Sequence, residues 1–181
     1  MLSLKRATLD PYFPAEISVV ISNIEAAPGL AWAQSMNTPC EVIPHQPHGK
    51  NRQAHEQQIH TCLQQHDIQL VCLAGYMRVL SPWLCEQWQG RMLNIHPSLL
   101  PSFRGLHTHE RALEAGVKYH GCTVHLVSEE LDGGPILEQA VVRVEPHDTA
   151  DSLAARVLQE EHRIYPQVLA RLARQQQQGQ L

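Results

Sequence analysis

The stretch Ile68-Gln69-Leu70-Val71-Cys72-Leu73-Ala74, which ends at Gly75, decides the fold class. It is a nearly continuous apolar run with the length of one strand, and such a run is typical of a strand that is covered on both faces. Short runs of this kind alternate along the chain with segments of helical composition. Because that alternation is the pattern of crossover units, the sequence predicts an α/β fold with a parallel central sheet.

The boundaries of the elements follow from apolar periodicity and from residues that start or stop helices. Ser81-Pro82 reads as a helix cap followed by a proline in the first turn, and Gly90 and Gly116 lie where helices commonly end. The expected strands are 17–22, 41–43, 70–74, 92–95, 122–127 and 136–144, and the expected helices are 25–36, 52–65, 82–89, 109–115 and 149–174. One domain is expected over residues 1–181, with a polar tail at 175–181 that is disordered.

Composition excludes several classes of function. The net charge of -4 provides no general field for nucleic acid or an anionic membrane, and no segment is apolar enough to span a bilayer. Five cysteines without paired spacing indicate reduced thiols, so a cytoplasmic location is expected. Twelve histidines make a metal site worth testing, but neither an HExxH nor a paired CxxC spacing occurs, and no metal is expected.

Asn94 and His96 lie two residues apart at the end of an expected strand, just before Pro97. Side chains two apart on a strand project from the same face, so an amide and an imidazole can contact one reacting atom. Such a pair can hold a developing oxyanion and move a proton, as acyl transfer requires. The alternative is that Asn94 caps a turn and His96 is an ordinary loop histidine.

Asp132 precedes Gly133 and Gly134 in the second informative loop. A carboxylate close to His96 would orient the ring and favour its imidazolium form. The alternative is that this segment only makes a tight turn. Likewise, His107 and His109 are either substrate contacts or residues that cap a helix, and the capping interpretation is favoured.

Five motifs follow one another along the chain: LAGYMRVLSP (73–82), LNIHPSLLP (93–101), GLHTH (105–109), HGCTVH (120–125) and ELDGGP (130–135). In order and spacing they resemble the phosphoribosylglycinamide formyltransferase family, and the resemblance runs from about residue 16 to residue 171. It implies a three-layer, mostly parallel, Rossmann-like sheet. It also implies formyl transfer from 10-formyltetrahydrofolate to the amine of glycinamide ribonucleotide in purine biosynthesis, without a metal and with a monomer or a homodimer as the assembly.

The resemblance also implies roles for individual residues. The catalytic asparagine, histidine and aspartate of the family fall on Asn94, His96 and Asp132. The residues that line the family's folate pocket match Arg52, Met77, Arg78, Val79 and Leu80, with Asn94 beside them, and its substrate-binding glutamate falls on Glu161. Without the resemblance, Arg52 and Glu161 would be interpreted as solvated helix surface.

The chain departs from the family at its beginning. The family starts with a strand and a Gly-x-Gly-Ser-Asn loop that binds the ribonucleotide phosphate, and this sequence contains no such segment. Residues 2–9 resemble the remainder of the helix that follows this loop. Since the first strand normally lies inside the sheet, its loss should leave two strand edges unpaired. The sequence therefore favours an internal or misassigned start at Met1 over a divergent member that has lost ribonucleotide binding.

Three rival functions remain. A formyltetrahydrofolate hydrolase would keep the same Asn94, His96 and Asp132. A methionyl-tRNA formyltransferase usually adds a C-terminal tRNA-binding domain, and this chain stops at Leu181 with no basic extension, so tRNA is not an expected partner. The third rival is a folate-binding remnant without catalysis, which the missing phosphate loop makes credible.

Overall fold

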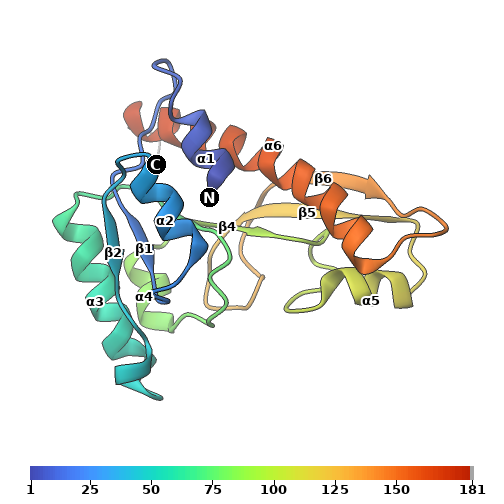
Figure 1. Cartoon of the computed structure of the whole chain (residues 1–181), viewed down its shortest axis with the longest axis horizontal. Coiled ribbons are helices and arrows are strands. Elements are labelled where there is room, and N and C mark those ends of the chain that lie inside the picture. The colour runs from blue at the N-terminus through green and yellow to red at the C-terminus, as the bar shows by residue number, and fades with distance from the viewer. Residues whose placement is uncertain (180–181) are drawn as a thin grey trace.

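The computed structural model describes residues 1–179, in which strands and helices alternate (Figure 1). The strands are β1 (Val20–Ser22), β2 (Cys40–Val42), β3 (Val71–Leu73), β4 (Met92–His96), β5 (Tyr119–Leu126) and β6 (Ile136–Arg143). The helices are α1 (Leu2–Ala7), α2 (Pro28–Ser35), the 3-10 turn η1 (Gln46–His48), α3 (Arg52–Gln65), α4 (Pro82–Gln87), α5 (Thr108–Glu114) and α6 (Ala150–Gln177). The predicted α/β class is confirmed.

Local capping explains which predicted boundaries agree with the structure. Helix α3 begins at the predicted residue because the Asn51 side chain accepts a hydrogen bond from the Ala54 N–H. Ser81 caps α4 in the same way through the Leu84 N–H, with Pro82 in the first turn. The first strand is shorter than predicted, because only Val20–Ser22 pairs with a neighbour.

The strands form two sheets, β1-β2 and β3-β4-β5-β6. Strands β1 and β2 are parallel, as are β3 and β4, whereas β5 pairs antiparallel with both β4 and β6. Parallel pairing therefore holds for the first four strands, and the arrangement as a whole is mixed. Strand β6 runs antiparallel to β5 because the connection at 127–135 is shorter than the roughly dozen residues that a parallel crossover needs, whereas the connection at 97–118 between β4 and β5 is long enough for either direction.

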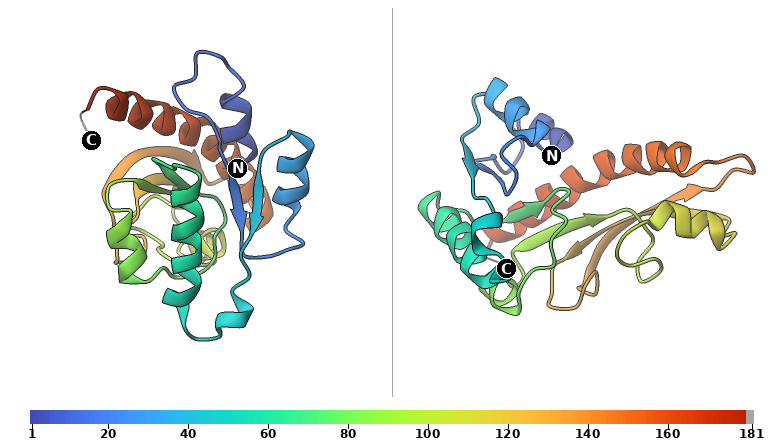
Figure 2. Two further views of the ribbon diagram at one scale, coloured as in Figure 1. Left: turned by 90° about the vertical axis from the view of Figure 1, so that its left-hand side faces the viewer. Right: turned by 60° about the horizontal axis from the view of Figure 1, so that its bottom comes forward.

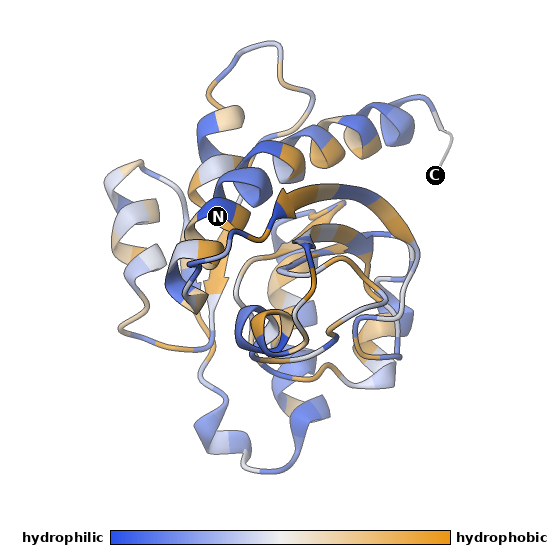
Figure 3. Ribbon diagram, turned by 90° about the vertical axis from the view of Figure 1, so that its right-hand side faces the viewer, coloured by the Kyte–Doolittle hydropathy of each residue, from blue (hydrophilic) through white to orange (hydrophobic). Residues whose placement is uncertain are grey.

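Helices cover both faces of the four-stranded sheet, which gives the three layers. On one face, α6 packs on β5 and β6, and α1 packs on α6. On the other face, Leu63 of α3, Leu84 of α4 and Trp88, which directly follows α4, form a second cluster with Met92 of β4. Figure 3 shows the apolar side of α6 turned toward the sheet and its polar side turned outward. No helix within residues 1–179 has both the length and the apolar character needed to cross a membrane.

The apolar stripe predicted for the last helix is confirmed in α6, and the helix extends beyond its predicted end. Its stripe residues are all buried: Leu153, Val157, Ile164, Val168 and Leu172. The expectation of disorder from residue 175 was wrong for residues 175–177, which complete the last turn, because the Gln177 amide donates to the Pro14 carbonyl at 3.0 Å. Residues 180–181 of the expected tail lie outside the described residues.

A cleft of about 810 Å³ separates β1 from β3 and is lined by both strands and by Met1 and Leu4. The two further views in Figure 2 show the β1-β2 pair standing apart from the larger sheet. The Val20 N–H donates to the Pro39 carbonyl, on the side that faces β2. The Val71 N–H donates to the Arg91 carbonyl, on the side that faces β4. Since backbone groups alternate sides along a strand, Ile21 and Cys72 direct their N–H and C=O groups toward the cleft. The structure thus has the two unpaired edges that the sequence led us to expect.

Candidate active site

The antiparallel pairing of β4 with β5 builds the candidate site. Asn94 lies opposite His125 and His96 lies opposite Thr123. Directly opposed residues on neighbouring strands share one face of the sheet, so four polar side chains gather at the end of β4. The predicted alternation of Asn94 and His96 therefore places them on the same face of the strand.

His96 lies between two hydrogen-bond acceptors. Its Nε2 is 3.0 Å from the Phe103 carbonyl oxygen, and its Nδ1 is 3.4 Å from Oδ2 of Asp132. A carbonyl oxygen can only accept, so Nε2 carries a hydrogen in either charge state of the ring. The second proton of an imidazolium would then sit on Nδ1, facing the carboxylate. The predicted proximity of Asp132 and His96 is present, and both side chains are more than nine-tenths buried.

Asp132 owes its position to a tight turn. Its own φ is +50°, and its Oδ2 accepts the Gly105 N–H at 2.8 Å. A Cβ on Gly134 would lie 1.9 Å from the Leu126 carbonyl oxygen, so the turn requires glycine at that position. The turn interpretation and the site interpretation of this segment are therefore compatible.

His125 is a site residue that sequence reasoning did not single out. Its Nδ1 lies 2.9 Å from the Leu126 carbonyl oxygen and therefore donates, which leaves Nε2 as an acceptor. The Asn94 amide nitrogen is 3.3 Å from this Nε2, and Oδ1 of Asp132 is 3.8 Å away. Burial lowers the pKa of His125, so the neutral ring can orient the Asn94 amide. Only the direction and register of β5 against β4 bring His125 opposite Asn94.

Thr123 secures the loop that follows His96. Its hydroxyl donates to the Ser98 carbonyl at 2.7 Å and accepts the Leu100 N–H at 3.0 Å and the Gln139 amide at 2.9 Å. Thr123 is fully buried, so these bonds are shielded from water. The segment after β4 is consequently held against β5 and β6.

Arg52 and the segment 77–80 lie together, as the expected folate pocket requires. The Arg52 guanidinium donates to the Val79 carbonyl at 3.2 Å. Met77 and Val79 are large apolar residues with 73% and 51% of their surface exposed, so this segment offers an accessible apolar surface. Within residues 1–179, neither a hydrogen bond nor an ion pair joins Arg52 or residues 77–80 to Asn94, His96 or Asp132.

Glu161 lies on α6 in a largely buried position near the Met1 amino group. Burial raises the pKa of its carboxyl group from 4.5 to about 7, and the amino group opposes that shift. This environment differs from the solvated helix surface that composition alone indicated. A carboxyl group that titrates near neutrality is suited to contact a substrate amine.

Glu161→Gln should change the pH dependence of stability. Because folding raises the pKa of Glu161, its contribution to stability is fully present below about pH 4.5 and is lost as the pH rises through about 7. We expect the variant to match the native protein in Tm at pH 4.5 and to exceed it at pH 8, which thermal unfolding at both values will measure. Glu160→Gln, at the neighbouring and more peripheral carboxyl, is the control. If Glu161→Gln changes Tm by the same amount at both pH values, folding does not raise the pKa of Glu161 and the prediction is wrong.

His107 and His109 occupy structural positions at the start of α5. His107 lies at the N-cap position with φ of +56° but makes no capping hydrogen bond, so the predicted capping role is wrong for its side chain. Nδ1 of His109 is 3.2 Å from Nε2 of His120, and burial lowers the pKa of His120 to about 4. These two rings are therefore a neutral pair near pH 7.

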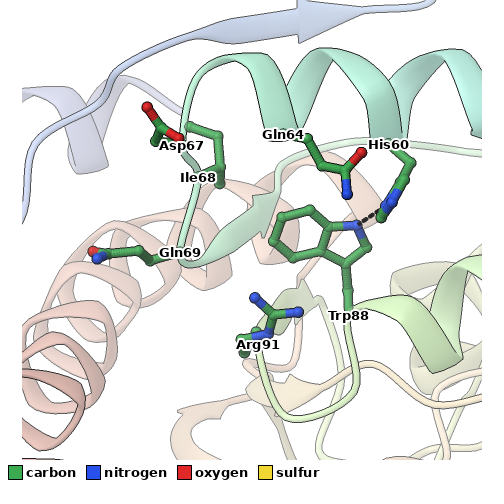
Figure 4. A pocket seen from close by; sticks show the side chains of 7 residues that line it. All are labelled: His60, Gln64, Asp67, Ile68, Gln69, Trp88 and Arg91. Atoms are coloured by element: carbon green, nitrogen blue, oxygen red, sulfur yellow. Dashed lines mark hydrogen bonds between the residues drawn. The ribbon is translucent and has the colours of Figure 1, made fainter.

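A second hollow, of about 420 Å³, lies between α3 and the end of α4 (Figure 4). There the Trp88 indole N–H donates to His60 at 3.2 Å, and Arg91 stacks over the Trp88 ring. Neither this hollow nor the cleft between β1 and β3 is lined by Asn94, His96 or Asp132. Within residues 1–179, no group of three or more His, Cys, Asp or Glu side chains is arranged to hold a metal ion.

Comparison with known proteins gives consistent matches. The model of the formyl transferase family matches residues 2–169. A phosphoribosylglycinamide formyltransferase of Haemophilus influenzae is 43% identical over 86% of this chain and 73% of its own length. The trifunctional purine biosynthetic protein adenosine-3 of Homo sapiens is 46% identical over 92% of this chain, which spans only 16% of that protein.

Solved structures agree with the sequence matches. The phosphoribosylglycinamide formyltransferase of Brucella melitensis superimposes with a TM-score of 0.89 at 51% identity, over 94% of this chain and 88% of its own. The glycinamide ribonucleotide transformylase 1 of Symbiobacterium toebii gives a TM-score of 0.91 at 40% identity, over 95% and 81%. The chain therefore belongs to the formyl transferase family.

Proposed function

We propose that this chain transfers the formyl group of 10-formyltetrahydrofolate to the amine of glycinamide ribonucleotide, a step of purine biosynthesis. The observation that carries the proposal is the position of His96, between the Phe103 carbonyl and the Asp132 carboxylate, with Asn94 on the same face of β4. The names of the relatives support the same reaction. Five free cysteines fit a reducing compartment, and we place the protein in the cytoplasm.

In the proposed mechanism, the substrate amine attacks the formyl carbon and forms a tetrahedral oxyanion. The second N–H of the Asn94 amide donates a hydrogen bond to this oxygen, and the positive charge of the His96 imidazolium, whose Nδ1–H faces Asp132, stabilises the oxygen electrostatically. The carboxylate of Asp132 balances the imidazolium charge. As the new carbon–nitrogen bond is completed, the bond to N10 of the folate breaks, and a water carries the proton from the amine to N10. Neither a metal nor a covalent enzyme intermediate takes part.

Binding roles follow from the surfaces described above. The exposed apolar segment 77–80, which includes Arg78 and Leu80, and the guanidinium of Arg52 would contact the folate, and Glu161 would contact the glycinamide end.

Formyl transfer assayed with both substrates tests the proposal. We expect formation of formylglycinamide ribonucleotide that depends on the enzyme, the folate and the amine, as measured by loss of formyltetrahydrofolate and by mass spectrometry of the product. Release of formate without the amine would identify a hydrolase instead. Folate binding without any turnover, at saturating concentrations of both substrates, would identify a binding module and overturn the proposal.

A further inference from the structure

The loop at residues 102–106 reaches both members of the His96–Asp132 pair through its backbone. The Phe103 carbonyl lies 3.0 Å from Nε2 of His96, and the Gly105 N–H donates to Oδ2 of Asp132 at 2.8 Å. The oxygen that accepts from Gly105 is the one that faces Nδ1 of His96 at 3.4 Å. One short loop therefore holds the histidine and the carboxylate at the same time.

This geometry depends on left-handed backbone conformations. Phe103 has φ of +55° and Gly105 has φ of +75°. Such values are unfavourable for most residues and persist only where surrounding contacts impose them. Within this loop, they turn the Phe103 carbonyl toward His96 and the Gly105 N–H toward Asp132.

Arg111 of α5 supplies such contacts from outside the loop. Its guanidinium donates to the Arg104 carbonyl at 2.6 Å and to the Leu106 carbonyl at 3.3 Å, and it lies 5.7 Å from the centre of the Phe103 ring. Arg104 in turn forms an ion pair with Glu130, close to Asp132 in the chain. Arg111 is exposed, so it can be replaced without opening the core.

We propose that residues 102–106 form a clamp that fixes the hydrogen of His96 on Nε2 and holds Nδ1 toward Asp132, and that Arg111 is the positioning residue that keeps the clamp closed. The neutral ring then has one tautomer, with its hydrogen on Nε2. Without the clamp, the ring can exchange tautomers and rotate away from the carboxylate. The catalytic meaning of the clamp rests on the proposed formyl transfer, whereas its effect on the tautomer does not.

Gly105→Ala tests the clamp against a matched control. Gly105 and Gly90 have φ of +75° and +72°, and a Cβ would meet nothing closer than 4.0 Å at Gly105 and nothing within 4 Å at Gly90. Alanine should therefore strain both backbones equally and lower Tm by similar amounts. We expect Gly105→Ala alone to lower kcat, by about tenfold or more, with little change in the KM for the folate.

Arg111→Ala is the second test, with Arg163→Ala as a control at an exposed arginine of α6. Nitrogen-15 NMR of the His96 ring gives a readout that needs no turnover. In the native protein and in both controls, Nε2 should carry the hydrogen throughout the titration. In Gly105→Ala and Arg111→Ala, the two neutral tautomers should mix, and kcat should fall.

These measurements distinguish a failure of the clamp proposal from a failure of the proposed formyl transfer. The clamp proposal is wrong if the His96 ring of the native protein already mixes tautomers. It is also wrong if the clamp variants match their controls in the nitrogen-15 signals of the ring and in kcat. A native protein with a single tautomer and no formyl transfer would support the clamp as a structural device and overturn the proposed function alone.

Discussion

His96→Ala is expected to lower kcat by about two or more orders of magnitude while leaving folate affinity largely unchanged. The variant loses the imidazolium charge that would stabilise the reacting oxygen, and it leaves the Asp132 carboxylate without its counter-charge in a nearly closed site. The proposed folate contacts at Arg52 and residues 77–80 are retained. Steady-state kinetics combined with folate titration by fluorescence will measure the two effects separately.

Two variants serve as comparisons for this result. Asp132→Asn retains an acceptor for the Gly105 N–H but removes the negative charge, so kcat should also fall strongly. His147→Ala, at an exposed histidine in the loop before α6, should leave kcat unchanged. If His96→Ala weakens folate binding as much as it lowers kcat, His96 is structural and the proposed mechanism is wrong.

A strand supplied to the cleft between β1 and β3 should raise Tm by about 10 °C or more. A six-residue apolar strand buried on both faces would gain on the order of 5 kcal/mol after the entropy of ordering it is subtracted. For a chain of this size, 1 kcal/mol corresponds to roughly 2–4 °C. The experiment places such a strand and a glycine-rich loop before Met1, whose side chain already lines the cleft, and follows thermal unfolding and solubility.

Amide hydrogen exchange locates the added strand. The Ile21 and Cys72 amides, which face the cleft, should become protected, whereas Val20 and Val71 are already hydrogen-bonded on their other side and should change little. A control segment of the same length with alternating Ser and Lys residues should change neither Tm nor exchange. If the apolar segment also leaves the Ile21 and Cys72 amides unprotected, the prediction that the cleft accepts a strand is wrong.

Local signals in the sequence were sufficient for most elements. Asn51 and Ser81 fix the starts of α3 and α4 through side-chain caps, and the stripe of α6 follows from one apolar period. The spacing of Asn94 and His96 placed both on one face of β4. The short 127–135 connection indicates that β5 and β6 are antiparallel, but the connection at 97–118 is long enough for either direction, so the reversal of β5 against β4 and the position of His125 were missed.

Other parts of the site have no signature in a single sequence. The Phe103 carbonyl and the Gly105 N–H contact the site through the backbone, and only φ values set by distant contacts such as Arg111 direct them there. The burial of Glu161 depends on the packing of α6 near the Met1 amino group, which links opposite ends of the chain. Propensity and periodicity carry no information on such long-range contacts.

The Tyr165 hydroxyl lies 2.8 Å from the Leu73 carbonyl oxygen and 3.2 Å from the Leu93 carbonyl oxygen, across sequence separations of 92 and 72 residues. The ribosome therefore releases β3 and β4 long before the helix that covers them is synthesised. The growing polypeptide must keep the face of these strands that α6 covers exposed until residues 150–177 have emerged. Ribosome-bound fragments that stop before residue 150 should accordingly recruit chaperones, and fragments that include α6 should release them.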